Sequence, residues 1–237
     1  MEKEDNLIPI FIGYDFRERA AANVLIDSIY QKSSFPVSIT PLITSQLIKK
    51  KLFYRERDKN QSTDFSFTRF LVPKLMGYKG WAIFMDCDML CRTDINKLWS
   101  LKDESKALLC VKHNHIPKSN AKFLGEKQTK YQKKNWSSLM LFNCAKCKNL
   151  TVEYVNTASG LELHQFKWLN DDSEIGEIKS FGWNFLVDVE ETPKLKKKND
   201  QIALLHWTLG GPWFDKNKKL SAFDQEWFNA RNDSIRI

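Results

Sequence analysis

The sequence lacks several features that would assign it to a class at once. Its 237 residues contain no apolar run near the roughly 20 residues that a membrane span requires. Residues 1–6 are charged and polar and lack the apolar core of a signal peptide. The five cysteines are odd in number and unevenly spaced, which argues against a disulfide framework. These absences predict a protein of the reducing cytoplasm.

Glycine-rich phosphate-binding motifs are also absent. Residues 7–13 are an apolar run, residues 16–31 have apolar positions at helical spacing, and residues 35–43 are strand-like, so the chain is predicted to open as β-α-β. Neither Gly-x-Gly-x-x-Gly nor a Walker A motif follows the first predicted strand, so a dinucleotide-binding or P-loop protein is not supported. Cys144 and Cys147 have no partner pair at zinc-finger spacing, and we interpret them as core thiols.

The composition is that of a folded α/β protein. Hydrophobic residues make up 42% of the chain and aromatic residues 13%, which is enough to build a core. No internal repeat or linker divides the chain. We therefore expect one domain over 1–237, with a nucleotide-binding half at about 7–111 and an acceptor or closing half at about 112–237. The formal charge of +8 favours polyanions, anionic lipid head groups or phosphorylated small molecules as partners.

Residues 81–88 are the main sequence evidence for a metal-binding site. Five apolar residues, 81–85, predict a strand that is buried on both faces, as in parallel sheets. Asp86 and Asp88 follow it, and side chains two apart on an extended chain point the same way. Ligands of open α/β sheets bind beyond the carboxyl ends of the strands, and a hard divalent cation prefers oxygen ligands. An acidic loop that only caps the strand is the alternative.

A histidine follows a second apolar strand much later in the chain. Residues 202–205 predict this strand, and His206 ends it, before Gly210 and Gly211. Imidazole is an acceptable ligand for Mn²⁺, and glycine lets backbone N–H groups approach an anion. We expect Asp86, Asp88 and His206 to converge as a metal site, although they lie far apart in the sequence.

The remaining pattern predicts the surroundings of this site. Residues 62–76 suggest a helix that brings Arg69 to the central strand, residues 107–111 and 136–143 predict strands, and residues 148–169 predict a helix. Residues 112–135 are rich in Lys and have no apolar periodicity, so we expect a mobile basic segment on the acceptor side.

These motifs occur in the order found in family 8-type glycosyltransferases, and the chain resembles that family from the first strand to Trp213. The resemblance implies a GT-A fold, a Rossmann-like α/β fold with a mixed, mostly parallel central sheet flanked by helices. It also implies roles for individual residues. They are a metal site (Asp86, Asp88, His206), donor-binding positions (Gly13, Tyr14, Asp15, Arg69, Gly210, Gly211) and a sugar-reading acidic pair with a catalytic role (Asp171, Asp172).

The sequence departs from the family pattern at three places. Asp171 and Asp172 stand where the family has an Asp-Gln pair. Gly211 stands where the family has a phosphate-binding Lys, so the diphosphate would be held by backbone amides or by Lys216 or Lys218. Residues 136–138, Trp-Ser-Ser, replace the family's Asn-Ala-Gly beside the donor sugar. The identity of the sugar therefore does not follow from the resemblance.

The resemblance implies a hexosyltransferase that moves a sugar from a nucleotide sugar, UDP-linked, with Mn²⁺ or Mg²⁺ and with retention of configuration. The acceptor would be a glycan, a lipid-linked sugar or a protein, and a peripheral contact with the anionic inner face of a membrane is compatible with the charge. No nucleic acid is expected. The alternatives are a sugar-phosphate nucleotidyltransferase, whose glycine-rich basic loop is missing here, and a non-enzymatic basic protein that binds RNA or a membrane surface.

Overall fold

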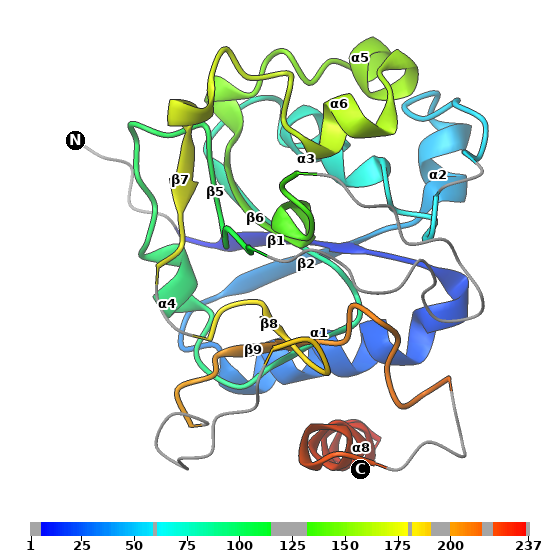
Figure 1. Ribbon diagram of the computed structural model, residues 1–237, viewed down its shortest axis with the longest axis vertical. Coiled ribbons are helices and arrows are strands. Elements are labelled where there is room, and N and C mark those ends of the chain that lie inside the picture. Colours follow the sequence, from blue (N-terminus) through cyan, green and yellow to red (C-terminus); the bar gives the residue numbers. More distant parts are fainter. Residues whose placement is uncertain are drawn as a thin grey trace.

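A six-stranded mixed sheet forms the centre of the computed structural model, which describes residues 6–58, 61–114, 132–179, 182–190, 200–214 and 220–235. Its strand order is β2-β1-β3-β6-β5-β7 (Figure 1). The bounds are β1 (Ile8–Gly13), β2 (Val37–Leu42), β3 (Trp81–Met85), β5 (Leu108–Cys110), β6 (Leu139–Asn143) and β7 (Ile175–Glu177). Pairs β2–β1, β1–β3 and β5–β7 are parallel, and β6 is antiparallel to both of its neighbours. The mixed, mostly parallel sheet predicted from the sequence is confirmed.

A smaller sheet extends from the end of β3. Its order is β4-β9-β8, with β4 (Met89–Cys91), β8 (Phe185–Leu186) and β9 (Leu204–His206). Helix α1 (Arg19–Lys32) packs against β4 and against the last helix, α8 (Ala222–Ser234). Figure 1 shows α1, α8 and the small sheet together on one side of the central sheet.

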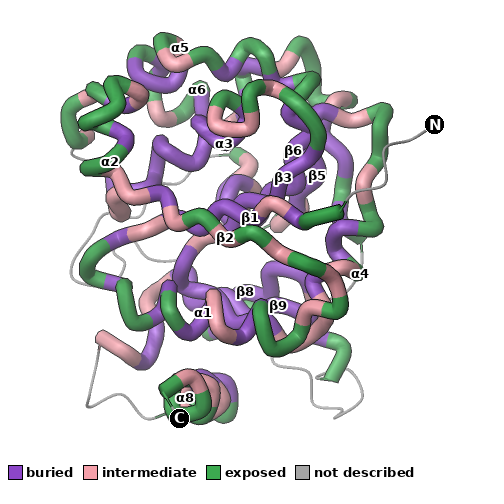
Figure 2. The backbone as a smooth tube through the Cα atoms, turned by 180° about the vertical axis from the view of Figure 1, so that it is seen from behind, coloured by how far each residue is buried: buried purple, intermediate pink, exposed green. Residues whose placement is uncertain are grey.

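Short helices cover the opposite side and the connections (Figure 1). They are α2 (Thr44–Lys49), α3 (Val72–Leu75), α4 (Asn96–Trp99), α5 (Val152–Thr157) and α6 (Gly160–His164). The 3-10 helices are η1 (Phe16–Glu18), η2 (Thr68–Leu71), η4 (Trp136–Ser138), η5 (Cys144–Lys146) and η6 (Asp172–Glu174). The central strands are buried along their length, whereas the edge strand β2 alternates between half-buried and exposed residues (Figure 2).

Two predicted helices are wrong in extent. Residues 62–76 form turns, then η2 and α3, because Pro73 in the first turn of α3 lacks the N–H that a longer helix would need. Residues 148–169 form α5 and α6 instead of one helix. Ser159 begins α6 by a capping box with Glu162, and this local competition for backbone N–H groups ends the preceding helix.

The structure agrees with the sequence in having no disulfide among the cysteines and no membrane-spanning helix in the described ranges. All five cysteines are free and buried, including Cys144 and Cys147. None of the helices in the described ranges combines the length and the apolar character of a membrane span. Strands β6 and β7 come from beyond residue 111 and join the central sheet, so both predicted halves contribute to it.

Candidate active site

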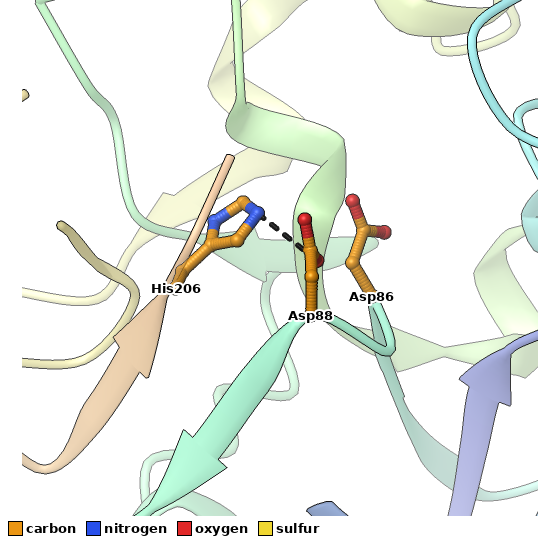
Figure 3. Close-up of side chains that lie close together, drawn as sticks. All are labelled: Asp86, Asp88 and His206. Carbon is orange, nitrogen blue, oxygen red and sulfur yellow. Dashed lines mark ion pairs between the residues drawn. The ribbon is translucent and has the colours of Figure 1, made fainter. Parts of the chain in front are cut away.

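Strand pairing brings Asp88 and His206 together. In the small sheet, Met89 is the antiparallel partner of His206, and the Trp207 N–H donates to the Asp88 carbonyl at 2.9 Å. Asp86 lies directly after β3, and its N–H is held by the Ser138 carbonyl at 2.9 Å. One ligand atom from each of Asp86, Asp88 and His206 lies within 4.8 Å of the others (Figure 3). The convergence expected from the sequence is therefore present.

A buried hydrogen-bond network sets the orientation of His206. The Asn184 amide Nδ2 donates to Ser138 Oγ at 2.9 Å, so its Oδ1 faces His206 Nδ1 at 2.7 Å. Because a carboxamide oxygen only accepts, the imidazole proton is assigned to Nδ1. His206 Nε2 faces Asp88 Oδ1, 3.3 Å away (Figure 3), and in the neutral imidazole this nitrogen carries the lone pair.

This arrangement fits a divalent cation. In the neutral ring, Nε2 and the Asp88 carboxylate are both acceptors, and Asp88 Oδ1 is buried without a hydrogen-bond donor among the described residues. Two acceptors at this distance repel each other unless a cation lies between them. Two carboxylates with one imidazole form a donor set that Mn²⁺ accepts, and the Asn184 contact is the outer hydrogen bond that metal-binding histidines usually make.

Arg69 holds Asp86 in place. Its Nη1 lies 2.8 Å from Asp86 Oδ1 and donates to the Ser137 carbonyl at 2.8 Å. The guanidinium lies over the rings of Phe65 and Phe84. Arg69 therefore neutralises Asp86 and fixes its position, a role that the sequence pattern did not specify.

A cavity of about 320 Å³ opens over these residues. Asp86, Asp88, His206 and Arg69 form its metal end, and Ser159, on the turn into α6, is part of the opposite wall. Its volume is at the lower end of the range for small-molecule sites.

The predicted nucleoside-binding residues lie at the end of β1 and in the turn after it. The Asp15 carboxylate accepts from the Arg17 side chain and from the N–H groups of Arg17 and Asp64. Burial raises the pKa of Asp15, but these donors outweigh it and the pKa lies below its usual value. A Cβ at Gly13 would come 2.3 Å from the ring of Phe65, so this glycine is required for packing. Tyr14 is half-buried against the core, and the donor-binding role of residues 13–15 stays a prediction.

The two glycines after β9 are also explained by packing. Gly210 has φ +106°, which is unfavourable for other residues, and its N–H donates to the Trp207 carbonyl at 2.8 Å. A Cβ at Gly211 would come 2.1 Å from the ring of Trp213. Lys216 and Lys218, the alternative phosphate ligands, lie outside the described residues.

The structure does not bring Asp171 and Asp172 to the cavity. Asp171 begins η6 and accepts from the Ser173 N–H at 2.6 Å. The side chain of Asp172 is 75% exposed and pairs with Lys133. Neither residue belongs to the cavity wall, so the geometry gives no support to their catalytic assignment, which stays a prediction.

Sequence reasoning missed His164, Lys134 and Asn135 in the cavity wall. His164 lies in a segment predicted only to pack as a helix, and its Nδ1 is 2.7 Å from Oγ of Ser137, a residue that the family resemblance placed beside the donor sugar. Lys134 and Asn135, placed by the sequence in a mobile segment, are buried in the wall, while residues 115–131 of that segment lie outside the described residues. The available signal was the cluster of polar residues at 133–138, just before β6.

Glu18 is a further carboxyl group that the sequence pattern did not single out. It is buried, and neither oxygen has a hydrogen-bond partner in the described part of the chain. Burial, and then the charges of Asp88, Asp15 and Asp86, raise the pKa of Glu18 well above its ordinary value. Burial and the neighbouring carboxylates therefore favour the protonated form of Glu18.

Comparison with known proteins identifies related sequences and folds. The sequence profile of glycosyl transferase family 8 matches residues 20–217. Protein CDI of Arabidopsis thaliana is 48% identical over 226 residues, which cover 94% of this chain and 86% of that protein.

Among solved structures, the glycosyltransferase GlyE of Streptococcus pneumoniae superposes with a TM-score of 0.61 at 12% identity, over 98% of this chain and 61% of that one. The galactosyltransferase LgtC gives 0.56 at 10% identity, over 97% of both chains. The bifunctional glycosyltransferase WbbM gives 0.56 at 15% identity, and the chain spans only 53% of its length. At these identities the structural likeness shows the fold, which is the GT-A fold of glycosyltransferases.

Proposed function

The chain belongs to glycosyl transferase family 8 and is a glycosyltransferase, and on this premise we propose that it transfers a hexose from a UDP-linked donor in a reaction that needs Mn²⁺ or Mg²⁺. One observation carries the proposal. Asp86, Asp88 and His206 converge at one end of a cavity large enough for a small ligand. The residues that would hold the ion are these three, and the ion would supply charge neutralisation for the departing diphosphate.

The protein's own residues prepare the site for that chemistry. Arg69 fixes Asp86, and Asn184 fixes the His206 ring with Nε2 toward Asp88. Groups that are already oriented need no rearrangement while charge develops on the leaving group, and this saves reorganisation energy in the transition state.

Retention of configuration is proposed to occur by front-side transfer. A double displacement needs a carboxylate behind the anomeric carbon. The carboxylates that line the described cavity are Asp58, Asp86 and Asp88, and the last two are committed to Arg69 and to the candidate metal site. In the front-side reaction, the bond from the anomeric carbon to the donor phosphate oxygen breaks and its electron pair stays on the phosphate. The acceptor oxygen bonds to the carbon and gives its proton to that phosphate oxygen.

The donor and acceptor classes rest on related proteins and on charge. LgtC is a galactosyltransferase crystallised with donor and acceptor sugar analogues, which supports a hexosyl donor here. The acceptor is proposed to be a glycan, a lipid-linked sugar or a protein. A cytoplasmic location, with peripheral contact at an anionic membrane face, is the proposal that fits the net charge of +8.

A nucleotide panel tests the proposal. The melting temperature of the full chain is measured with UDP, GDP and CDP, each with and without Mn²⁺, and the hydrolysis of UDP-hexoses is assayed in parallel. We expect stabilisation by UDP only with Mn²⁺. Asp88→Asn should abolish this shift and the hydrolysis, whereas Asp103→Asn, an exposed carboxylate change away from the cavity, should preserve both. A wild-type protein that binds no nucleoside diphosphate in the presence of Mn²⁺ would refute the proposal.

A further inference from the structure

We propose that Lys134 and Asn135 form the site that binds the donor's diphosphate, in place of the closing-loop Lys that Gly211 replaces. The inference rests on the function proposed above and adds to it the residues that hold the anionic part of the donor.

The backbone around Lys134 has a conformation that needs support. Lys133 and Asn135 both have left-handed conformations, with φ +61° and +65°. This conformation is unfavourable for residues other than glycine and persists where the surroundings hold it. The resulting turn presents Lys134, whose residue exposure is only 8%, in the cavity wall.

The turn is attached to the metal end of the cavity. The Asn135 carbonyl accepts from Ser138 Oγ at 2.6 Å and, at 3.4 Å, from the Asn184 amide that orients His206. Asn135 Oδ1 faces Thr208 Oγ1, two residues beyond His206, at 3.4 Å. The turn therefore lies beside the ligands for the cation, and a diphosphate bridging that cation would lie next to it.

Asn135 supplies a donor that lacks an acceptor. Its Nδ2 is buried, and the described residues offer it no hydrogen-bond partner. A buried amide N–H without a partner is unfavourable, so the group is expected to meet an acceptor on a ligand. An ammonium group and an amide donor in one wall are suited to an anionic oxygen.

The charges near Asp86 and Asp88 also favour a diphosphate beside Lys134. Asp86 is neutralised by Arg69 at 2.8 Å, so Asp88 alone opposes a divalent ion and leaves one net positive charge. Each phosphate of a nucleotide sugar carries one negative charge, and one of these therefore needs a further cation. Lys134 balances it, and its contribution increases as the leaving phosphate gains charge.

The test compares two adjacent lysines in the full chain. Lys134→Met removes the ammonium group and keeps most of the side-chain volume. Lys133→Asn is the matched control. It removes a charge that contacts Gln165 and Asp172 outside the cavity, and it keeps a residue type that tolerates the left-handed conformation. Affinities for UDP with Mn²⁺ and for uridine are measured by calorimetry.

We expect Lys134→Met to weaken UDP binding roughly 10- to 100-fold and to leave uridine binding unchanged, with partial rescue by Lys134→Arg. Lys133→Asn should stay within about 2-fold of the wild type. Retained uridine binding shows that the variant is folded.

Two outcomes overturn the inference while the proposed function stands. In the first, wild-type UDP binding is unchanged in Lys134→Met but weakened in Lys216→Ala or Lys218→Ala, so that the cation comes from the closing loop. In the second, only UDP-sugar binding and not UDP binding depends on Lys134, so that it contacts the sugar. If the wild type binds no nucleoside diphosphate, the proposed function itself fails.

Discussion

Asn184 offers a test of how the metal ligands are positioned. Its amide makes two well-formed hydrogen bonds, with His206 Nδ1 at 2.7 Å and with Ser138 Oγ at 2.9 Å. Asn184→Ala removes both, and the buried His206 Nδ1 loses its acceptor, whereas Ser138 Oγ keeps its bond to the Asn135 carbonyl. This change should cost about 1–3 kcal/mol of unfolding free energy. The His206 ring is then free to turn, and loss of such an outer hydrogen bond typically lowers metal affinity about 10- to 100-fold.

The backbone at Asn184 provides a control within the same position. Its φ is +57°, so Ala adds steric strain that Gly does not. Asn184→Gly should therefore be about 1 kcal/mol more stable than Asn184→Ala, although both lack the amide. If the amide acts on the metal site through His206, the two variants should lose Mn²⁺ affinity equally.

Two measurements on the ligand-free protein decide whether Asn184 acts on the metal site through His206. Urea unfolding gives the stability of each variant, and calorimetric titration with Mn²⁺ gives the affinity without any donor present. Unchanged Mn²⁺ affinity in both variants, with reduced stability, would mean that Asn184 supports the fold and not the ligand set. Loss of affinity in Asn184→Ala alone would assign the effect to backbone strain.

Two further predictions concern the ends of β1 and β9. Gly211→Ala should lower the unfolding free energy, measured by urea titration, by about 1–3 kcal/mol, because the new Cβ displaces the Trp213 ring. A variant as stable as the wild type would show that this loop is loosely packed. Asp15→Asn should destabilise the protein at neutral pH, because the native carboxylate accepts from Arg17 and from the Asp64 N–H and has a lowered pKa. That stabilisation is present above the ordinary Asp pKa of 3.8 and is lost as the pH is lowered through the pKa of Asp15 in the folded protein. The unfolding free energies of wild type and variant should therefore converge in acid. A difference in stability that does not change with pH would contradict this reasoning.

Much of the fold followed from local patterns. Strands β1, β3, β5 and β6 are short apolar runs in the sequence, and such runs bounded by polar residues are buried strands in α/β proteins. The edge position of β2 followed from Pro36 and Pro41, since proline cannot donate to a neighbouring strand. Helix lengths were less predictable, because they depend on single residues such as Pro73 and Ser159 that end a helix within an otherwise periodic segment.

The metal end of the site was predictable for a specific reason. Asp86 and Asp88 follow the buried strand β3, and β4, which begins at Met89, pairs with β9, which ends at His206. The three side chains therefore meet where the small sheet joins the end of β3. The supporting contacts were not predictable. Arg69 was expected to contact the donor, but its bonds to Asp86 and to the Ser137 carbonyl depend on the packing of segments that are remote in sequence.

The phosphate end of the site shows why a glycine is ambiguous in a sequence. A residue without a side chain leaves space, and the sequence does not say what occupies that space. At Gly211 the occupant is the ring of Trp213, 2.1 Å from where a Cβ would be, so packing alone accounts for the glycine. Under the proposed function, the charge that the family pattern places there has to be supplied elsewhere, because a divalent ion and the carboxylates would not together balance a diphosphate. Besides Arg69, the cavity wall contains the buried Lys134, which lies between two left-handed residues and beside Asn135, whose Nδ2 has no hydrogen-bond acceptor among the described residues. The side chain of Lys134 was hidden in the sequence because it belongs to a lysine-rich stretch in which nothing but tertiary structure distinguishes one lysine from the next.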